Sequence, residues 1–317
     1  MKKTVNKEHV EGRVYEHSLA IKTVQNRDSA NFGKEFIAGT LDVATDEDCL
    51  NVVTIHFTYV TEKTSKGNNN DTYTALKNII ENGKTVLVDG KDAATMVKID
   101  TALGVNDFYT NRNGQEELVS AKRNDGGFVH IVNKLADEAA RSTFEMDMLI
   151  NGTRLVEKDE ERNIANDYLV VKGEVFNFRN AILPVEFVVK NEGGIKYFQS
   201  LEASASNLVF TKVWGTINSE TIITKREEEN AFGEAAVKEY ERKVREWVIT
   251  GAAKETYELG DAKDGITVEE IQKAMTDRET YLADVKKRQD EYQASKNSGA
   301  ATPASAGVTA AQGGFNF

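Results

Sequence analysis

The chain has 317 residues and a formal net charge of −11. Its length allows two or three domains with cores of their own, whereas its acidic balance argues against a general polyanion binder, because clustered Lys and Arg drive binding to a phosphate backbone. Cys49 is the single cysteine, which excludes an internal disulfide and a thiolate metal cage. The sequence contains no apolar run of the kind found in a signal peptide or a membrane span, so we expect a cytoplasmic protein.

The first third of the chain predicts a β-barrel. Strands are expected at 14–24, 35–43 and 51–60, and alternating apolar side chains are clearest in the third. A helix capped by Asp71 follows, and further strands end at Val132. Strands, one helix and strands again is the element order of a five-stranded barrel of the oligonucleotide/oligosaccharide-binding (OB) type. We place this barrel at residues 10–135.

A second OB-like barrel is predicted at residues 142–222. Its clearest strands are YLVVKGEVFNF, which begins at Tyr168, and the run opened by Pro184, since proline is tolerated at the first residue of a strand. The segment 191–194 contains two glycines and is interpreted as a hairpin turn. The segment 195–198 is then the partner strand.

The periodicity changes after residue 226, where apolar side chains recur every three or four positions. This pattern predicts a helical hairpin at 227–292, whose second helix starts with the capping box Thr267-Val268-Glu269-Glu270. The remaining residues, 293–317, have the composition of a flexible tail. The fold class expected is thus mainly β, with tandem OB-like barrels, a C-terminal α-hairpin and a disordered tail.

The barrel order, the lysine-bearing loop after NVVTIHFTYV, the strand pairs YLVVKGEVFNF and PVEFVVKNEGGIKYF, and the tail ending in phenylalanine together resemble single-stranded DNA-binding proteins of the OB-fold kind. The type encoded in bacteriophage replication modules is the nearest. The resemblance implies a role in DNA replication or recombination and a partner-binding tail tip at Phe315 and Phe317. Bacterial members of that family carry an acidic tip, whereas this tip has no acidic side chain.

Such a function requires aromatic rings that stack on bases and cations that follow phosphates. Phe128 and Phe36 are among the aromatic candidates, and core packing is the alternative for each single ring. Phe108-Tyr109 and Tyr197-Phe198 are the most informative pairs, because one ring of two neighbours in a strand must leave the barrel interior. From these candidates we select as the expected nucleic-acid-binding residues Lys34, Phe57, Tyr59, Lys63, Lys66, Phe108, Tyr109, Arg112, Lys122, Arg123, Phe178, Arg179, Lys196, Tyr197, Phe198, Lys212 and Trp214.

The sequence contains no catalytic triad pattern, no phosphate-binding glycine loop and no metal-ligand spacing. We therefore expect no enzymatic activity, no catalytic residue, no cofactor and no bound metal. Single-stranded DNA is the expected partner, with replication proteins reached through the tail and self-association as further possibilities. Two alternatives stay open: a phage structural or assembly protein that makes protein contacts, which the acidic balance favours, and a carbohydrate or other ligand module.

Overall fold

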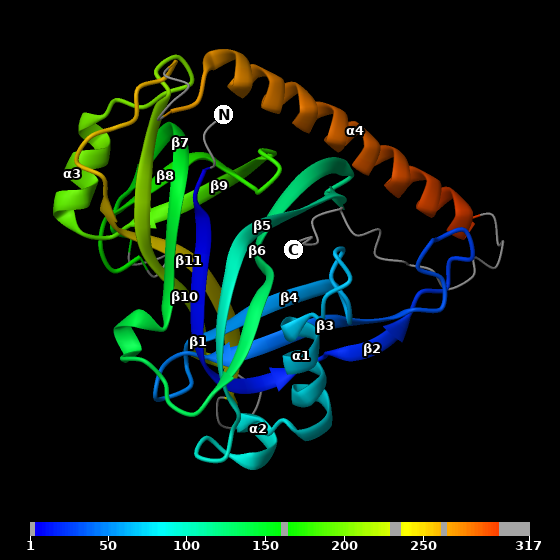
Figure 1. The fold of residues 1–317 in the computed structure, drawn as a ribbon. Helices are drawn as coiled ribbons and strands as arrows, with labels where there is room; N and C mark the ends of the chain where they lie inside the picture. The colour runs from blue at the N-terminus through cyan, green and yellow to red at the C-terminus, as the bar shows by residue number, and fades with distance from the viewer. Residues whose placement is uncertain (1–3, 160–163, 229–235, 261–264, 298–317) are drawn as a thin grey trace.

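The structure is a computed structural model that describes residues 4–159, 164–228, 236–260 and 265–297; for 220–228, 236–243 and 296–297 it describes the backbone alone. Figure 1 shows two β lobes with a long helix beside them. The strands are β1 (Asn6–His17), β2 (Ala20–Thr23), β3 (Glu35–Ala44), β4 (Val52–Thr61), β5 (Met96–Arg112), β6 (Gln115–Val132), β7 (Ser142–Val156), β8 (Tyr168–Phe176), β9 (Ile182–Val189), β10 (Val209–Glu228) and β11 (Ala236–Ala252). The helices are α1 (Asp71–Asn82), α2 (Val86–Asp89), α3 (Glu192–Ser200) and α4 (Val268–Asn297), with a 3-10 turn at Glu138–Ala140.

The first barrel closes through strands β1, β3, β4, β6 and β5, in that spatial order. Every neighbouring pair is antiparallel except β4 and β6, which run parallel, and β5 pairs back with β1. In chain order, helix α1 lies between β4 and β5. Asn70 caps it, one residue before the predicted cap Asp71, and Gly83 ends it. This is the OB topology that the sequence predicts.

The second barrel repeats the same order with β7, β8, β9, β11 and β10. Its one parallel pair joins β9 to β11, and β10 pairs back with β7. Strand β11 therefore corrects the sequence analysis, which made residues 227–251 the first helix of a hairpin and ended the barrel at 222. The alternating positions Trp247 and Ile249 are buried, and Val248 between them is buried as well. Burial on both faces hides the strand period.

Helix α3 is the second correction. Residues 195–198 form part of this helix and not a strand, and Asn191 caps it by accepting a hydrogen bond from the Gly194 amide. The segment 191–194 is therefore a helix start. Of the predicted helical hairpin, the second helix exists as α4, and its capping box is confirmed by reciprocal bonds between Thr267 and Glu270.

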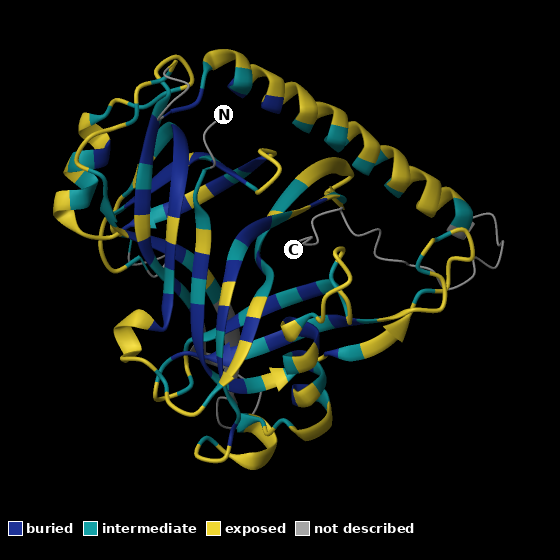
Figure 2. Cartoon of the chain, viewed as in Figure 1, coloured by how far each residue is buried: buried dark blue, intermediate teal, exposed yellow. Residues whose placement is uncertain are grey.

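Helix α4 also runs five residues past Tyr292, into the segment predicted to be a tail. The rest of that predicted tail, with Phe315 and Phe317, lies outside the described residues. Figure 2 shows that exposed residues dominate most of the length of α4, whereas buried positions alternate with intermediate and exposed ones along the barrel strands.

Strand β1 belongs to both lobes. It pairs with β3 and β5 of the first barrel along most of its length, and its first half, Asn6–Val10, also pairs with β7 of the second. Within the described residues the eleven strands accordingly form one sheet. One hydrophobic cluster runs through both barrels, from Val14 and Ile55 to Phe187 and Trp247. The boundaries of independently folding domains stay a prediction.

Candidate functional site

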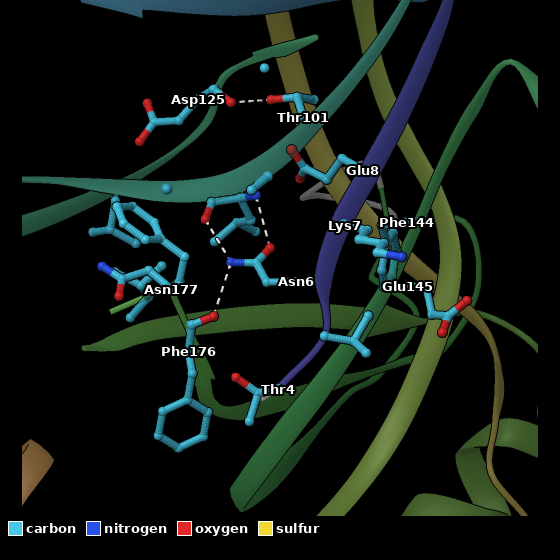
Figure 3. A pocket seen from close by; sticks show the side chains of 18 of the residues that line it. Thr4, Asn6, Lys7, Glu8, Thr101, Asp125, Phe144, Glu145, Phe176 and Asn177 are labelled. Atoms are coloured by element: carbon cyan, nitrogen blue, oxygen red, sulfur yellow. Dashed lines mark hydrogen bonds between the residues drawn. The ribbon is translucent and has the colours of Figure 1, made fainter. Parts of the chain in front are cut away.

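A cleft with a volume of about 1480 Å³ lies where the two barrels and α4 meet. Its walls come from the start of β1, the middle of β5, β6 around Phe128, the start of β7, the loop between β8 and β9, β10 around Trp214 and the third and fourth turns of α4. Figure 3 shows several of these side chains around the cavity. Because the walls combine residues far apart in sequence, only the folded chain creates this site.

Three aromatic rings line the cleft and are exposed to solvent. Phe128 on β6, Phe178 in the β8–β9 loop and Trp214 on β10 keep 45%, 47% and 42% of their surface accessible. Large apolar side chains are usually buried, so three partly exposed rings on one cavity are chemically informative. Their faces are suited to stacking on planar ligands.

Contacts with neighbouring residues hold two of these rings in position. Trp214 lies opposite Gly251 in the β10–β11 pair, and its indole covers that glycine so closely that a Cβ on Gly251 would lie 2.4 Å from Nε1. The Arg179 guanidinium lies 5.2 Å from the centre of the Phe178 ring, within cation–π range. Arg179 also lines the cleft, so a cation stands next to an exposed ring.

Asn6 clips the two barrels together at the side of the cleft. Its Nδ2 donates to the carbonyl of Leu103 at 3.0 Å and to that of Phe176 at 3.3 Å, and its Oδ1 accepts from the Leu103 amide at 3.0 Å. Figure 3 shows these bonds as dashed lines. One side chain thus joins β1, β5 of the first barrel and β8 of the second, which fixes the width of the cavity.

Glu8 is a buried carboxyl on the cleft wall. It is 2% exposed, and its Oε1 accepts a hydrogen bond of 2.7 Å from Nε1 of Trp247, while Oε2 is buried without a hydrogen-bond partner. The pKa of Glu8 is raised to about 8, chiefly by burial; the hydrogen bond from Trp247 lowers it and the negative charge of Asp125 adds to the rise. Glu8 therefore carries a proton at neutral pH.

The acidic residues of the cleft are largely compensated. Asp107 pairs with Arg278 at 2.7 Å, Asp125 with Arg123 at 2.5 Å and Glu145 with Lys212 at 2.6 Å. Glu8 is protonated, Asp100 is hydrogen-bonded to the ring of His9 at 2.8 Å, and the last carboxylate on the wall is Asp277. Lys7 and Arg179 add positive charge. The cleft is consequently much less negative than its composition suggests.

The structure brings three of the predicted site residues together in the cleft, namely Phe178, Arg179 and Trp214. Others are spread over the molecule. Lys34, Lys63 and Lys66 are exposed in loops of the first barrel, and Tyr59 packs against Phe36 with ring centres 4.7 Å apart. Phe108, Tyr109 and Arg112 lie on the protruding β5–β6 hairpin, and Lys196 lies on α3. Their part in nucleic-acid binding stays a prediction.

Two predicted stacking residues are core residues instead. Phe57 is 3% exposed and Phe198 is 2% exposed, so neither ring can stack on a base. The prediction that one ring of the pair Tyr197-Phe198 leaves a barrel interior was wrong, because both residues lie on a helix and not on a strand. On α3 the Phe198 ring packs inward, and the Tyr197 hydroxyl donates to the carbonyl of Ala253 at 2.9 Å.

Lys122 lies at the contact between the barrels and not in the cleft. Its ammonium is 4.7 Å from the centre of the Trp247 ring and 5.7 Å from that of Phe187, and it donates to the carbonyl of Glu186. Burial lowers the pKa of Lys122 to about 8, against the pull of Glu186 and Glu246. These contacts give Lys122 a role in joining the barrels.

Several cleft residues were not predicted from the sequence, among them Asn6, Lys7, Arg278 and Tyr281. Asn6 and Lys7 belong to a polar stretch before the first expected strand, so the alternation of apolar residues did not reveal β1 there. Arg278 and Tyr281 were placed on a helix, but nothing in an amphipathic pattern states which surface the helix covers.

The described part of the chain contains no group of three or more His, Cys, Asp or Glu side chains that could hold a metal ion. Its helices include none with the length and apolarity needed to cross a bilayer.

The chain is similar to one protein-family model and to a solved structure. The structure is a deletion mutant of the single-stranded DNA binding protein from Thermus aquaticus, with a TM-score of 0.46 and 8% sequence identity over 83% of this chain and 100% of that chain. No curated protein matches the sequence. The model of the YorF family matches residues 5–288. The chain therefore belongs to the YorF family.

Proposed function

We propose that the protein binds single-stranded DNA without catalysis, with bases stacked in the cleft between its barrels. The observation that carries the proposal is the set of three exposed rings, Phe128, Phe178 and Trp214, on one cavity. Stacking on aromatic side chains contributes about 1 to 3 kcal/mol per base and tolerates any sequence, because every base has a flat face. The same proposal includes a cytoplasmic role in the DNA replication or recombination of a phage.

The charge of the cleft determines how such binding should respond to salt. Lys7 and Arg179 are the cleft cations with no ion pair assigned above, so one or two phosphate contacts are expected. For single strands the logarithm of the affinity falls with the logarithm of salt by about 0.7 per neutralised phosphate. Stacking therefore supplies most of the binding energy, and the affinity should fall by less than about tenfold between 50 and 200 mM salt.

The test replaces Phe128, Phe178 and Trp214 by alanine together. Loss of three stacking contacts at 1 kcal/mol or more each should weaken binding of fluorescein-labelled dT oligomers by at least about 100-fold in fluorescence anisotropy. Phe32→Ala is the matched control, because Phe32 is 50% exposed but lies outside the cleft. Circular dichroism checks that all variants are folded.

Intrinsic fluorescence gives a second readout on the unlabelled protein. The chain has two tryptophans, of which Trp214 is 42% exposed in the cleft and Trp247 is 2% exposed in the core. Quenching by dT oligomers should thus come from Trp214 and disappear in Trp214→Phe. Absence of any saturable binding by the folded wild-type protein at micromolar concentration would remove the proposal and leave an assembly role.

A further inference from the structure

Helix α4 is attached to the second barrel by apolar contacts at its start. Ile271 and Ala274, with Ile266 just before the helix, are buried in a small cluster with Leu149, Phe176, Ile182 and Phe210. Ile271 and Ala274 lie in the first two turns of α4. Burial of that much apolar surface makes this end of the helix the firm one.

Beyond its first two turns α4 is held by polar bonds, most of them to the β5–β6 hairpin of the first barrel; Arg278 also donates to the carbonyl of Ile182 in the second barrel at 3.4 Å. Arg278 donates to both oxygens of Asp107 at 2.7 and 3.2 Å, Lys286 pairs with Glu116, and Gln289 bonds with both backbone groups of Tyr109. The pair of Lys286 and Glu116 is 34% and 43% exposed, and exposed pairs contribute little to stability. The pair of Arg278 and Asp107 is 13% and 2% exposed and is the strong tie.

The tied segment covers the cleft. Asp277, Arg278 and Tyr281 line it from α4, opposite walls that come from both barrels. Figure 1 shows α4 running from the second lobe past the end of the β5–β6 hairpin. A helix of 30 residues is about 45 Å long, so it bridges the two lobes over the cavity.

We propose that α4 is a gate: it releases the β5–β6 hairpin, stays anchored on the second barrel, and so admits a single strand that has no free end. The inference rests on the proposed function and adds the route of entry to it. The unequal attachment of the two ends is the physical basis, because polar ties separate at smaller cost than a buried apolar cluster does. Rotation of α4 about its anchored first two turns would be a hinge motion, in which a few residues at the end of an element change their backbone angles.

The test locks the gate outside the cleft. Glu116→Cys and Lys286→Cys place a cysteine pair where the ion pair stands, and Cys49→Ser removes the native thiol. A bismaleimide with an internal disulfide joins the two cysteines, and a reductant separates them again. Association of the full chain with circular oligo(dT) and with linear oligo(dT) of equal length is then followed by stopped-flow fluorescence of Trp214. Treatment with N-ethylmaleimide controls for modification of the thiols.

Locked protein should associate with the circle at least about tenfold more slowly than with the linear strand, and reduction should restore the rate. Loss of binding to both DNAs that reduction reverses also supports the gate, and shows that strand ends do not thread. Equal rates on circle and linear strand in the locked state overturn the gate while leaving the proposed function intact. Failure of the unlocked protein to bind either DNA overturns the proposed function, and the gate with it.

Discussion

Replacing Glu8 by glutamine is expected to flatten the pH dependence of stability between about pH 4.5 and 8. Glu8 has a folded-state pKa of about 8, because burial raises it from the ordinary value of 4.5. The folded protein therefore holds this proton more tightly than the unfolded chain does. The contribution of the Glu8 proton to the free energy of unfolding is fully present below pH 4.5 and is lost as the pH rises through 8.

The expected effect is large. The two pKa values of Glu8 differ by about 3.5 pH units, and each unit corresponds to about 1.4 kcal/mol. Glu8→Gln should therefore be more stable than the wild type at pH 9, by about 3 to 5 kcal/mol, and within about 1 kcal/mol of it at pH 4.5. Glutamine keeps the oxygen that accepts from Trp247, so the packing is preserved.

Urea denaturation at pH 4.5, 7 and 9, followed by circular dichroism, measures this difference. Glu117→Gln is the control, because Glu117 is exposed near the tip of the β5–β6 hairpin and its replacement should shift the unfolding free energy by less than about 0.5 kcal/mol. Equal slopes of stability against pH in wild type and Glu8→Gln would show that the carboxyl is ionised in the folded protein.

Gly127→Ala is expected to destabilise the protein by about 3 kcal/mol. A Cβ at Gly127 would lie 1.9 Å from the carbonyl oxygen of Asp100, where β5 and β6 approach closely beside a register shift between Asp100 and Ala102. Both contacting groups are backbone, so the strand itself has to move. Phe128 follows directly in the chain, and the displacement should also weaken binding in the cleft.

Gly152→Ala supplies the comparison for this substitution. Gly152 is likewise a strand glycine, but a Cβ there would meet no atom within 4 Å. Its replacement should change the unfolding free energy by less than about 0.5 kcal/mol in the same urea titration. If both variants unfold at the same urea concentration, the backbone around the register shift between Asp100 and Ala102 adjusts to a Cβ at position 127 without loss of stability.

The sequence predicted the first barrel well because its strands alternate and its helix has local caps. Ile55 and Phe57 face inward from one strand, and Gly83 ends the helix as expected. The second barrel was harder, because β11 is buried on both faces around Trp247 and because Gly193-Gly194 occurs at a helix start as well as in a turn. Here tertiary pairing overrides the local pattern.

The candidate site could be predicted only in part. Phe178, Arg179 and Trp214 were predicted because binding of a single strand requires aromatic and cationic side chains, but Phe57 and Phe198 were predicted on the same grounds and are buried. Composition does not state which face of an element is covered. Glu8 was missed because it belongs to the polar stretch before the first expected strand and glutamate is normally exposed, whereas here it is 2% accessible.

Strand β1 pairs with both barrels at once, and Asn6 adds bonds across the same seam. Modules on a flexible linker vary their separation with linker conformation, whereas two barrels fused in this way keep one spacing. If a single strand binds across both barrels, as proposed, every copy of the protein therefore contacts the same length of it. The number of nucleotides that each copy occludes should accordingly stay constant as salt and protein density change.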